Sequence, residues 1–420
     1  MGPVVPSERD RLVSTDAPAE GTRKRLDHID AMRPVKQAAV VSTHTLIFFA
    51  PLATNTTVIG LIMLTRFSRE AFLFVSACML TYSYRDTAKL KLNHYWKRRF
   101  ISVGVPYLAW TVIYYFYTTA HPVVGFPWYS FDHTITFSAV GFHYFAHILR
   151  TGYYHLYYLI VILEFYLLFP LLLKFIRRFT MWHKHIMVAA VIWQLAFGVL
   201  VDSQPFGIHI SEVMQTRFVY SYVVYLLGGM IVALHLDEVH QWIVNHARSI
   251  ICLTILSAFG AEVLSYCGRY HWLPSYFHTD TLVFAPAIMP YNVGAILCVY
   301  LLGVYLVAPQ RSLRTRAAVQ SGSDNSYGVY LSQMLWIPFL LRFRNHLGLH
   351  VHWQIGVPLA LVVVYTAGMI FTALVARTPL AKAVTGRSQV TWKSLLPRRH
   401  ETPEVLRGDT GDSPLDVVDE

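Results

Sequence analysis

The stretch RPVKQAAVVSTHTLIFFAPLA, residues 33–53, is the first strongly apolar run of the chain. Arg33 and His44 lie eleven positions apart at its head. This is almost three turns of α-helix, so both side chains share one face, about 16 Å apart along the axis. We expect Arg33 at the membrane edge and His44 near its middle, where an ionisable side chain is unfavourable and indicates a functional site. A cation and an imidazole placed in this way could hold the two ends of one long substrate.

The composition is that of a membrane protein. Of 420 residues, 55% are hydrophobic and only 14% are charged, whereas soluble domains carry about a quarter charged residues. Apolar runs near or above the length needed to cross a bilayer recur along most of the chain, which predicts an all-α, polytopic fold. We expect about ten transmembrane helices, at 35–53, 62–84, 100–120, 153–174, 186–201, 217–236, 249–267, 281–307, 325–345 and 353–376.

Lysine and arginine gather in alternate loops between the predicted helices, and this asymmetry predicts that both termini are cytoplasmic. It also explains the net charge of +11 without nucleic acid as a partner. We therefore predict a multi-pass protein of the cell membrane, embedded in the lipid bilayer. Its three parts are a disordered cytosolic tail at 1–32, a transmembrane domain at 33–376 and a polar, acidic cytosolic tail at 377–420.

Three consecutive cations, Lys97, Arg98 and Arg99, precede the third predicted helix. Membrane topology explains most of these charges, but they also suit a phosphate-bearing ligand on the cytosolic side, where Arg33 is expected. The extended arm of coenzyme A separates its thioester from its phosphates by on the order of 15–20 Å, which is close to the rise from Arg33 to His44. Acyl-CoA could thus bind with its thioester beside the imidazole, a side chain suited to general-base chemistry near neutral pH.

Glu164 lies inside the predicted helix 153–174, where a carboxylate needs a partner or a polar cavity. It could orient His44 or stabilise its protonated form. A purely structural pairing with Arg66 or Arg69 is an equal alternative. The histidine clusters of the chain have no Cys, Asp or Glu at ligand spacing, and we predict no metal site.

Several segments, taken in their order along the chain, carry a resemblance to a known family. They are Leu26–Arg33 with His44, Arg66–Ala77, Tyr95–Arg99 with Pro106 and Tyr107, His155–Leu159 and Ser326–Leu331. Together they resemble the membrane-bound acyltransferase family 3, the integral-membrane O-acyltransferases that act on sugars and other hydroxylated acceptors. The resemblance covers residues 26–376, and Arg33 with His44 fits the R-x10-H motif of the family.

The resemblance implies that His44 is the essential histidine and that Arg33 helps to hold the acyl donor. It also implies that the basic element before the third helix contacts the donor's phosphates. In that element Lys97 stands where the family has an arginine, and a lysine binds phosphate as a point charge rather than through two parallel bonds. Gln333 stands where a histidine often follows the late motif Ser326–Leu331.

We predict a membrane O-acyltransferase that moves an acyl group, such as acetyl, from cytosolic acyl-CoA to a hydroxyl of a carbohydrate or glycosylated acceptor. Acyl-CoA would be a co-substrate, and no cofactor is expected. His44 would act as general base or as a transient acyl-histidine, with Glu164 as a second catalytic residue. The side chains predicted to bind the donor are Arg33, Lys97, Arg98 and Arg99.

Two alternatives follow from the same residues. The first is a transporter or exporter of an envelope glycan or lipid, in which buried polar side chains line a pathway without acyl transfer. The second is a family member that has lost activity and serves as an assembly subunit. Consumption of acyl-CoA by the purified protein separates the enzyme from both alternatives.

Overall fold

The computed structural model describes residues 26–51, 55–87, 90–120, 138–203, 215–270, 272–273 and 285–390. This part of the chain is helical and contains no β-strand, which confirms the predicted all-α class. Six of its helices are long and apolar enough to cross a membrane, and a bent pair of helices raises that number to seven. The count of ten and the cytoplasmic placement of the termini stay predictions.

The six helices are α4 (Leu92–Ala120), α6 (Tyr157–Arg178), α7 (His183–Ser203), α11 (Ala247–Arg269), α12 (Met289–Val307) and α14 (Trp353–Val375). The pair bent by 104° is α9 (Val223–Leu234) and α10 (Leu236–Asn245). The remaining predicted spans correspond to α1 (Asp27–Phe49), α2 (Thr56–Thr65) with α3 (Phe67–Tyr84), and α13 (Leu313–His346). Shorter elements are α5 (Ala139–Thr151), α15 (Ala381–Thr385) and the 3-10 turns η3 (Tyr154–Leu156), η4 (Thr180–Trp182), η6 (Val219–Tyr222) and η8 (Pro286–Ile288).

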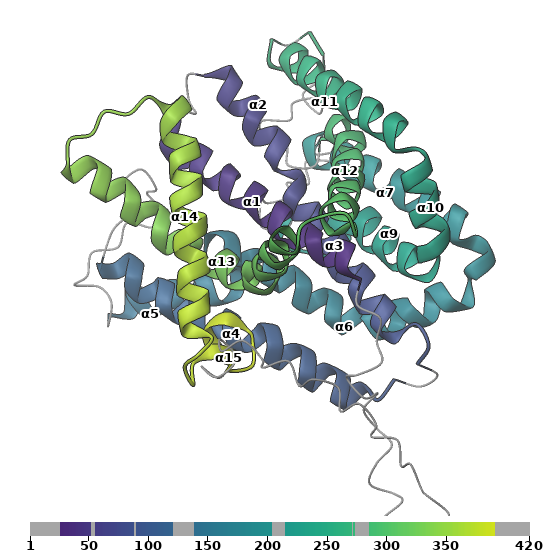
Figure 1. Cartoon of the computed structure of the whole chain (residues 1–420), viewed down its shortest axis with the longest axis horizontal. Helices are drawn as coiled ribbons and strands as arrows, with labels where there is room; N and C mark the ends of the chain where they lie inside the picture. Colours follow the sequence, from purple (N-terminus) through teal and green to yellow (C-terminus); the bar gives the residue numbers. More distant parts are fainter. Residues whose placement is uncertain are drawn as a thin grey trace, which may run out of the picture.

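α1 lies in the middle of the bundle and packs against α2, α3, α12, α13 and α14 (Figure 1). A helix that faces lipid must be apolar, whereas a helix enclosed by others can carry polar side chains. α1 buries Lys36 and Gln37, and α13 buries Ser332 and Gln333 in its middle. The polarity of these two helices is therefore consistent with their inner positions.

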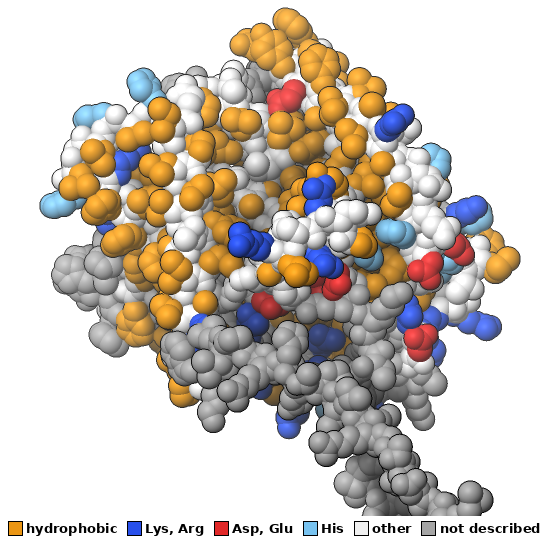
Figure 2. All heavy atoms as spheres, in the orientation of Figure 1, with side chains coloured by type: hydrophobic (Ala, Val, Ile, Leu, Met, Phe, Trp, Pro, Cys, Tyr) orange, Lys and Arg blue, Asp and Glu red, His pale blue; other side chains and the backbone are white. Residues whose placement is uncertain are grey.

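The outer surface of the bundle is mainly apolar, in contrast to the polar inner helices α1 and α13. Hydrophobic side chains cover most of the upper and left-hand part of Figure 2, over α2, α11 and α14. The large apolar side chains of these helices that are more than half exposed include Leu256 and Phe259 of α11 and Leu359 of α14. Charged side chains gather lower on the same face. Exposed apolar helices of this kind are expected where a protein meets the hydrocarbon of a bilayer.

The predicted helix 62–84 is divided into two. The side chain of Asn55 accepts hydrogen bonds from two backbone N–H groups in the first turn of α2 and so caps its start. α2 ends at Thr65, and α3 begins two residues later after a turn. The hydroxyl of Thr43 donates to that of Thr65 at 2.8 Å, so the break lies beside α1 at the level of His44.

The structure describes helices at the inner ends of both predicted tails. α1 begins at Asp27, inside the predicted tail 1–32, and its first turns are buried in the core. At the start of the predicted tail 377–420, the short helix α15 packs against α4 and α13. The indole N–H of Trp110 donates to the carbonyl of Val384 at 2.8 Å and holds α15 in place. The rest of both tails lies outside the described residues.

α3 and α9 approach each other closely at Gly229. A Cβ atom on Gly229 would lie 2.4 Å from the carbonyl oxygen of Phe74 and 3.1 Å from the side chain of Ala77. Small residues permit such approaches between membrane helices. α3 also carries the buried ion pair of Arg69 and Glu70, with 2.5 Å between the charged atoms. The close contact at Gly229 holds α3 beside α9, whereas the ion pair lies within α3 itself.

We expect Gly229→Ala to destabilise the protein by about 1–3 kcal/mol, because the added methyl group overpacks the α3–α9 contact. The loss is measured as a lower unfolding temperature of the purified protein in detergent. Gly104→Ala in α4 is the matched control, since a Cβ there meets no atom within 4 Å and alanine favours helix. Equal losses in the two variants, or no loss in Gly229→Ala, would contradict the close approach.

Candidate active site

One face of α1 carries Arg33, Lys36, Gln37 and His44, which helical spacing places above one another. Lys36 is 3% exposed and Gln37 is 0% exposed. Neither polar atom of the Gln37 carboxamide has a hydrogen-bond partner, and the same holds for Nδ1 of His44. A buried polar atom without a partner is unfavourable by about 1–3 kcal/mol. This face of α1 is therefore better suited to binding a ligand than to packing.

The ring of His44 lies against the turn that precedes α6. Its centroid is 5.2 Å from that of Tyr154 and 6.2 Å from that of His155. The carboxamide of Gln333 on α13 also approaches His44, but neither of its polar atoms makes a hydrogen bond of normal geometry. Two imidazoles and a carboxamide thus meet inside the bundle with polar atoms free to bind.

A tight turn places Tyr154 and His155 at this point. α5 ends at Thr151 and is followed by Gly152, whose φ of 77° is readily adopted only by glycine. A Cβ on Gly152 would lie 2.4 Å from the backbone of Tyr157, so a larger residue cannot replace it without movement. Tyr154 itself has a φ of 41°, a strained value for a residue with a side chain. Strain of this kind is concentrated at functional sites.

His155 is a buried histidine to which the sequence analysis assigns no role. It is 4% exposed, and its ring nitrogens approach the backbone of Tyr330 and Leu331 without a hydrogen bond of normal geometry. Its ring lies 5.0 Å from that of Tyr330 and 5.6 Å from that of Tyr114, and the Tyr330 hydroxyl donates to the His155 backbone carbonyl. In the sequence, His155 stands out only by its position before an apolar helix, at the start of the segment His155–Leu159 that resembles the family.

The predicted donor-binding cations separate into two groups. Lys97 and Arg98 are exposed on the surface of α4. Arg99 points inward, with its guanidinium carbon 5.8 Å from the ring centroid of Tyr166, and its Nε is buried without a hydrogen-bond partner. Arg33 also interacts electrostatically with Tyr166. The structure therefore brings Arg33 and Arg99 together around one tyrosine.

Arg33 has a carboxylate partner in this arrangement. Its guanidinium lies 3.2 Å from the carboxylate of Asp30, one turn earlier in α1. The Arg33 side chain is 36% exposed, whereas that of Asp30 is 8% exposed. A partly exposed arginine can exchange a carboxylate for a phosphate, since both accept two parallel N–H bonds.

Aromatic rings connect the end of the bundle that carries Arg33 with the two histidines. The ammonium of Lys36 lies 3.0 Å from the ring centroid of Phe72. Phe72 is 5.9 Å from Tyr330, which in turn contacts His155. Tyr327 stacks on Tyr330 at 6.4 Å. These rings therefore pack in a row beside the polar face of α1.

Glu164 has a structural partner instead of a contact with His44. Its Oε2 accepts a hydrogen bond from the backbone N–H of Val219 at 2.9 Å, at the start of η6. Within the described residues no hydrogen bond or ion pair joins Glu164 to His44, and Arg69 pairs with Glu70. A catalytic role of Glu164 stays a prediction.

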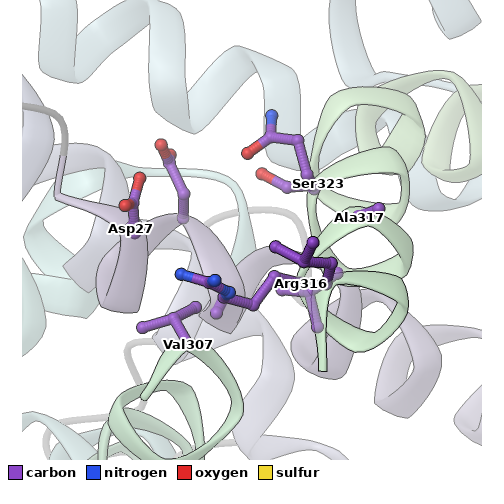
Figure 3. Close-up of a pocket in the computed structure, with 10 residues that line it drawn as sticks. Asp27, Val307, Arg316, Ala317 and Ser323 are labelled. Carbon is purple, nitrogen blue, oxygen red and sulfur yellow. The ribbon is translucent and has the colours of Figure 1, made fainter. Parts of the chain in front are cut away.

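A cavity of about 380 Å³ lies between the first turn of α1 and the start of α13 (Figure 3). Asp27 and Asp30 line one side, and Arg316 and Ser323 line the other. The hydroxyl of Ser323 is buried without a hydrogen-bond partner. Because Asp30 also contacts Arg33, the cavity lies at the same end of the bundle as Arg33 and Arg99.

Comparison with protein families gives one match. A family profile described as an acyltransferase domain matches residues 27–377, from the first residue of α1 to just beyond α14. The comparisons with curated proteins and with solved structures give no match. The matched region contains every side chain of the site described above.

Proposed function

The chain belongs to acyltransferase family 3 and is a membrane acyltransferase, and we propose that it moves an acyl group from cytosolic acyl-CoA to a hydroxyl of a carbohydrate or glycosylated acceptor. One observation carries the proposal. The enclosed polar face of α1 joins Arg33 at one end of the bundle to His44 inside it, with unpaired polar atoms between them. A long ligand with an anionic end and a reactive end fits this arrangement.

Coenzyme A supplies such a ligand. Its phosphates would bind Arg33 and Arg99, which lie around Tyr166. Its arm carries amide groups, which can donate to and accept from the unpaired carboxamide of Gln37. The rise of about 16 Å along α1 then brings the thioester to His44. Exposed Lys97 and Arg98 would add only long-range attraction for the phosphates.

The nucleotide end of acyl-CoA would occupy the cavity of Figure 3. A carboxylate such as that of Asp27 accepts hydrogen bonds from ribose hydroxyls or an amino group. The guanidinium of Arg316 suits a further phosphate. The ion pair of Asp30 with Arg33 would open as the donor enters, since phosphate competes for the same guanidinium.

Two chemical routes fit His44. As general base, the imidazole takes the proton of the acceptor hydroxyl, the oxygen attacks the thioester carbonyl, and the departing thiolate takes the proton from the imidazolium. As nucleophile, one ring nitrogen attacks the thioester carbonyl, and coenzyme A departs as the thiol with the proton of the other ring nitrogen. The acceptor hydroxyl then attacks the acyl-histidine, takes the acyl group and returns its proton to the imidazole. In either route Gln333 would orient the ring by accepting from Nδ1–H, and His155 would hold a proton nearby.

No observation specifically favours either alternative, the exporter of an envelope glycan or lipid or the inactive assembly subunit. An exporter would use the same buried polar residues, but the family match is to an acyltransferase domain. An inactive subunit has no need of a buried His44 ring or of Arg33 and Arg99 placed around one tyrosine. We therefore retain acyl transfer as the proposed activity.

We expect His44→Ala and His44→Gln to lower acyl transfer by at least about 100-fold, because either change removes the group that moves the proton or carries the acyl chain. The measurement is release of free coenzyme A thiol from acetyl-CoA by the reconstituted protein, supplied with envelope extract as acceptor. His350→Ala, an exposed histidine after α13, is the control and should retain full activity. Normal rates in correctly inserted His44 variants would refute the mechanism.

Arg98→Ala and Arg99→Ala each remove one positive charge at adjacent positions of α4, one exposed and one pointing inward. We expect Arg99→Ala to raise the half-saturating acetyl-CoA concentration by about 10- to 100-fold, since a charge-assisted hydrogen bond is lost. Arg98→Ala should change it by less than about twofold, because an exposed cation contributes little. Equal effects, or a larger effect at Arg98, would mean that the phosphates bind on the outside of α4.

A further inference from the structure

Lys36 is a buried cation to which neither chemical route at His44 gives a part. It lies one turn after Arg33 on α1 and is 3% exposed. Its ammonium lies over the ring of Phe72 on α3, 3.0 Å from the centroid. Within the described residues, no hydrogen bond or ion pair reaches this ammonium. Its three N–H groups therefore have no acceptor.

The ring of Phe72 does not balance the charge of Lys36. A cation over an aromatic face gains much less than the burial of an ammonium costs. Arg33, which interacts electrostatically with Lys36, is also positive and adds repulsion. A lysine in the interior of a membrane bundle is expected to face an anion or a polar path. This part of α1 therefore lacks an anion.

The same imbalance extends to the neighbouring arginines. Arg33, Lys36 and Arg99 bring three positive charges, and Arg33 and Arg99 meet around Tyr166. In the described part of the chain, Arg33 alone among the three is paired with a carboxylate, that of Asp30. Two positive charges are left over. A ligand with two negative charges would neutralise the cluster.

Tyr327 on α13 adds a hydrogen-bond donor between these groups. Its ring stacks on Tyr330, which lies 5.9 Å from Phe72, the ring under Lys36. Tyr327 also interacts electrostatically with Tyr166, the tyrosine between the two arginines. Its hydroxyl is buried without a hydrogen-bond partner. A hydroxyl and several cations that lack an acceptor suit the oxygens of a phosphate.

The depth of Lys36 in the bundle indicates which anion it meets. Lys36 precedes His44 by eight positions, a rise of about 12 Å along α1. Its side chain leans toward the N-terminal end of the helix, so the bound anion would lie still farther from His44. A carboxylate in the acyl group would lie at the level of His44 and would not reach Lys36. A phosphate at the near end of the pantetheine arm fits this depth.

We propose that Lys36 binds the phosphate of acyl-CoA that is bonded to the pantetheine arm. The pyrophosphate of coenzyme A carries two negative charges, which equals the excess of the cluster. Lys36 would hold the inner phosphate as a point charge, and the arginines would bind the outer one. This inference rests on the proposed acyl-CoA donor and adds to it a third donor-binding residue.

The experiment uses donors that are shortened step by step. S-acetyl-4′-phosphopantetheine retains the phosphate next to the arm, and S-acetylpantetheine has no phosphate. The reconstituted protein receives each donor with envelope extract as acceptor, and kcat/KM is measured from the release of free thiol. Lys36→Met removes the charge at nearly constant volume. Lys184→Met, the same change at an exposed position of α7, is the matched control.

We expect Lys36→Met to lower kcat/KM by about tenfold or more for acetyl-CoA and for S-acetyl-4′-phosphopantetheine, since both lose a charge-assisted bond. The value for S-acetylpantetheine should change by less than about twofold. The Kd for coenzyme A, measured without acceptor, should rise by about tenfold. Lys184→Met should behave as the native protein in every assay.

The unfolding temperature separates donor binding from a structural role of Lys36. Without ligand, Lys36→Met should unfold at the same temperature as the native protein or at a higher one. The reason is that an apolar side chain replaces a buried charge that has no anion. A lower unfolding temperature would overturn the proposal, since the ammonium would then stabilise the fold by itself.

Three further results would overturn the role of Lys36. They are an equal loss with S-acetylpantetheine, no loss with the donors that carry phosphate, and the same losses in Lys184→Met. The proposed function fails separately, if the native protein releases no thiol from acetyl-CoA or if the His44 variants stay active. The Kd for coenzyme A still tests Lys36 in that case, so the two failures are distinguishable.

Discussion

The structure depends on the enclosure of one polar face of α1 by other helices. Lys36, Gln37 and His44 could not face lipid, and each gains a protein environment only because α2, α3, α12, α13 and α14 surround the helix. The apolar outer helices supply the contact with the bilayer. Because the outer helices meet the bilayer, α1 can carry charged and titratable side chains from the edge of the bundle into its interior.

The proposed acyl transfer depends on the enclosure of this polar face of α1. Two arginines at one end, around Tyr166, suit the phosphates of a donor, and two histidines deeper inside suit acyl transfer. The break between α2 and α3 lies at the level of the histidine, where it interrupts an otherwise continuous span.

Local geometry explains what the sequence could predict. The eleven-residue spacing of Arg33 and His44 needs only helix geometry, so their shared face was predictable. Three cations, Lys97, Arg98 and Arg99, stand side by side in the sequence, and only Arg99 turns inward. The rotation of α4 against its neighbours decides which one does so, and the sequence does not show that rotation. The partner of Glu164 and the contact of His155 with His44 depend on chain segments far apart in sequence. Tertiary contacts of this kind leave no local pattern.

The most direct test of the account is a structure of the protein bound to a non-hydrolysable acetyl-CoA analogue. The account predicts the acyl carbon within about 4 Å of a ring nitrogen of His44, close to the distance of a reactive pair. It also predicts phosphate oxygens within hydrogen-bond distance of Arg33 and Arg99. An analogue whose phosphates bind Lys97 and Arg98 on the outer surface, with its acyl group away from His44, would contradict it.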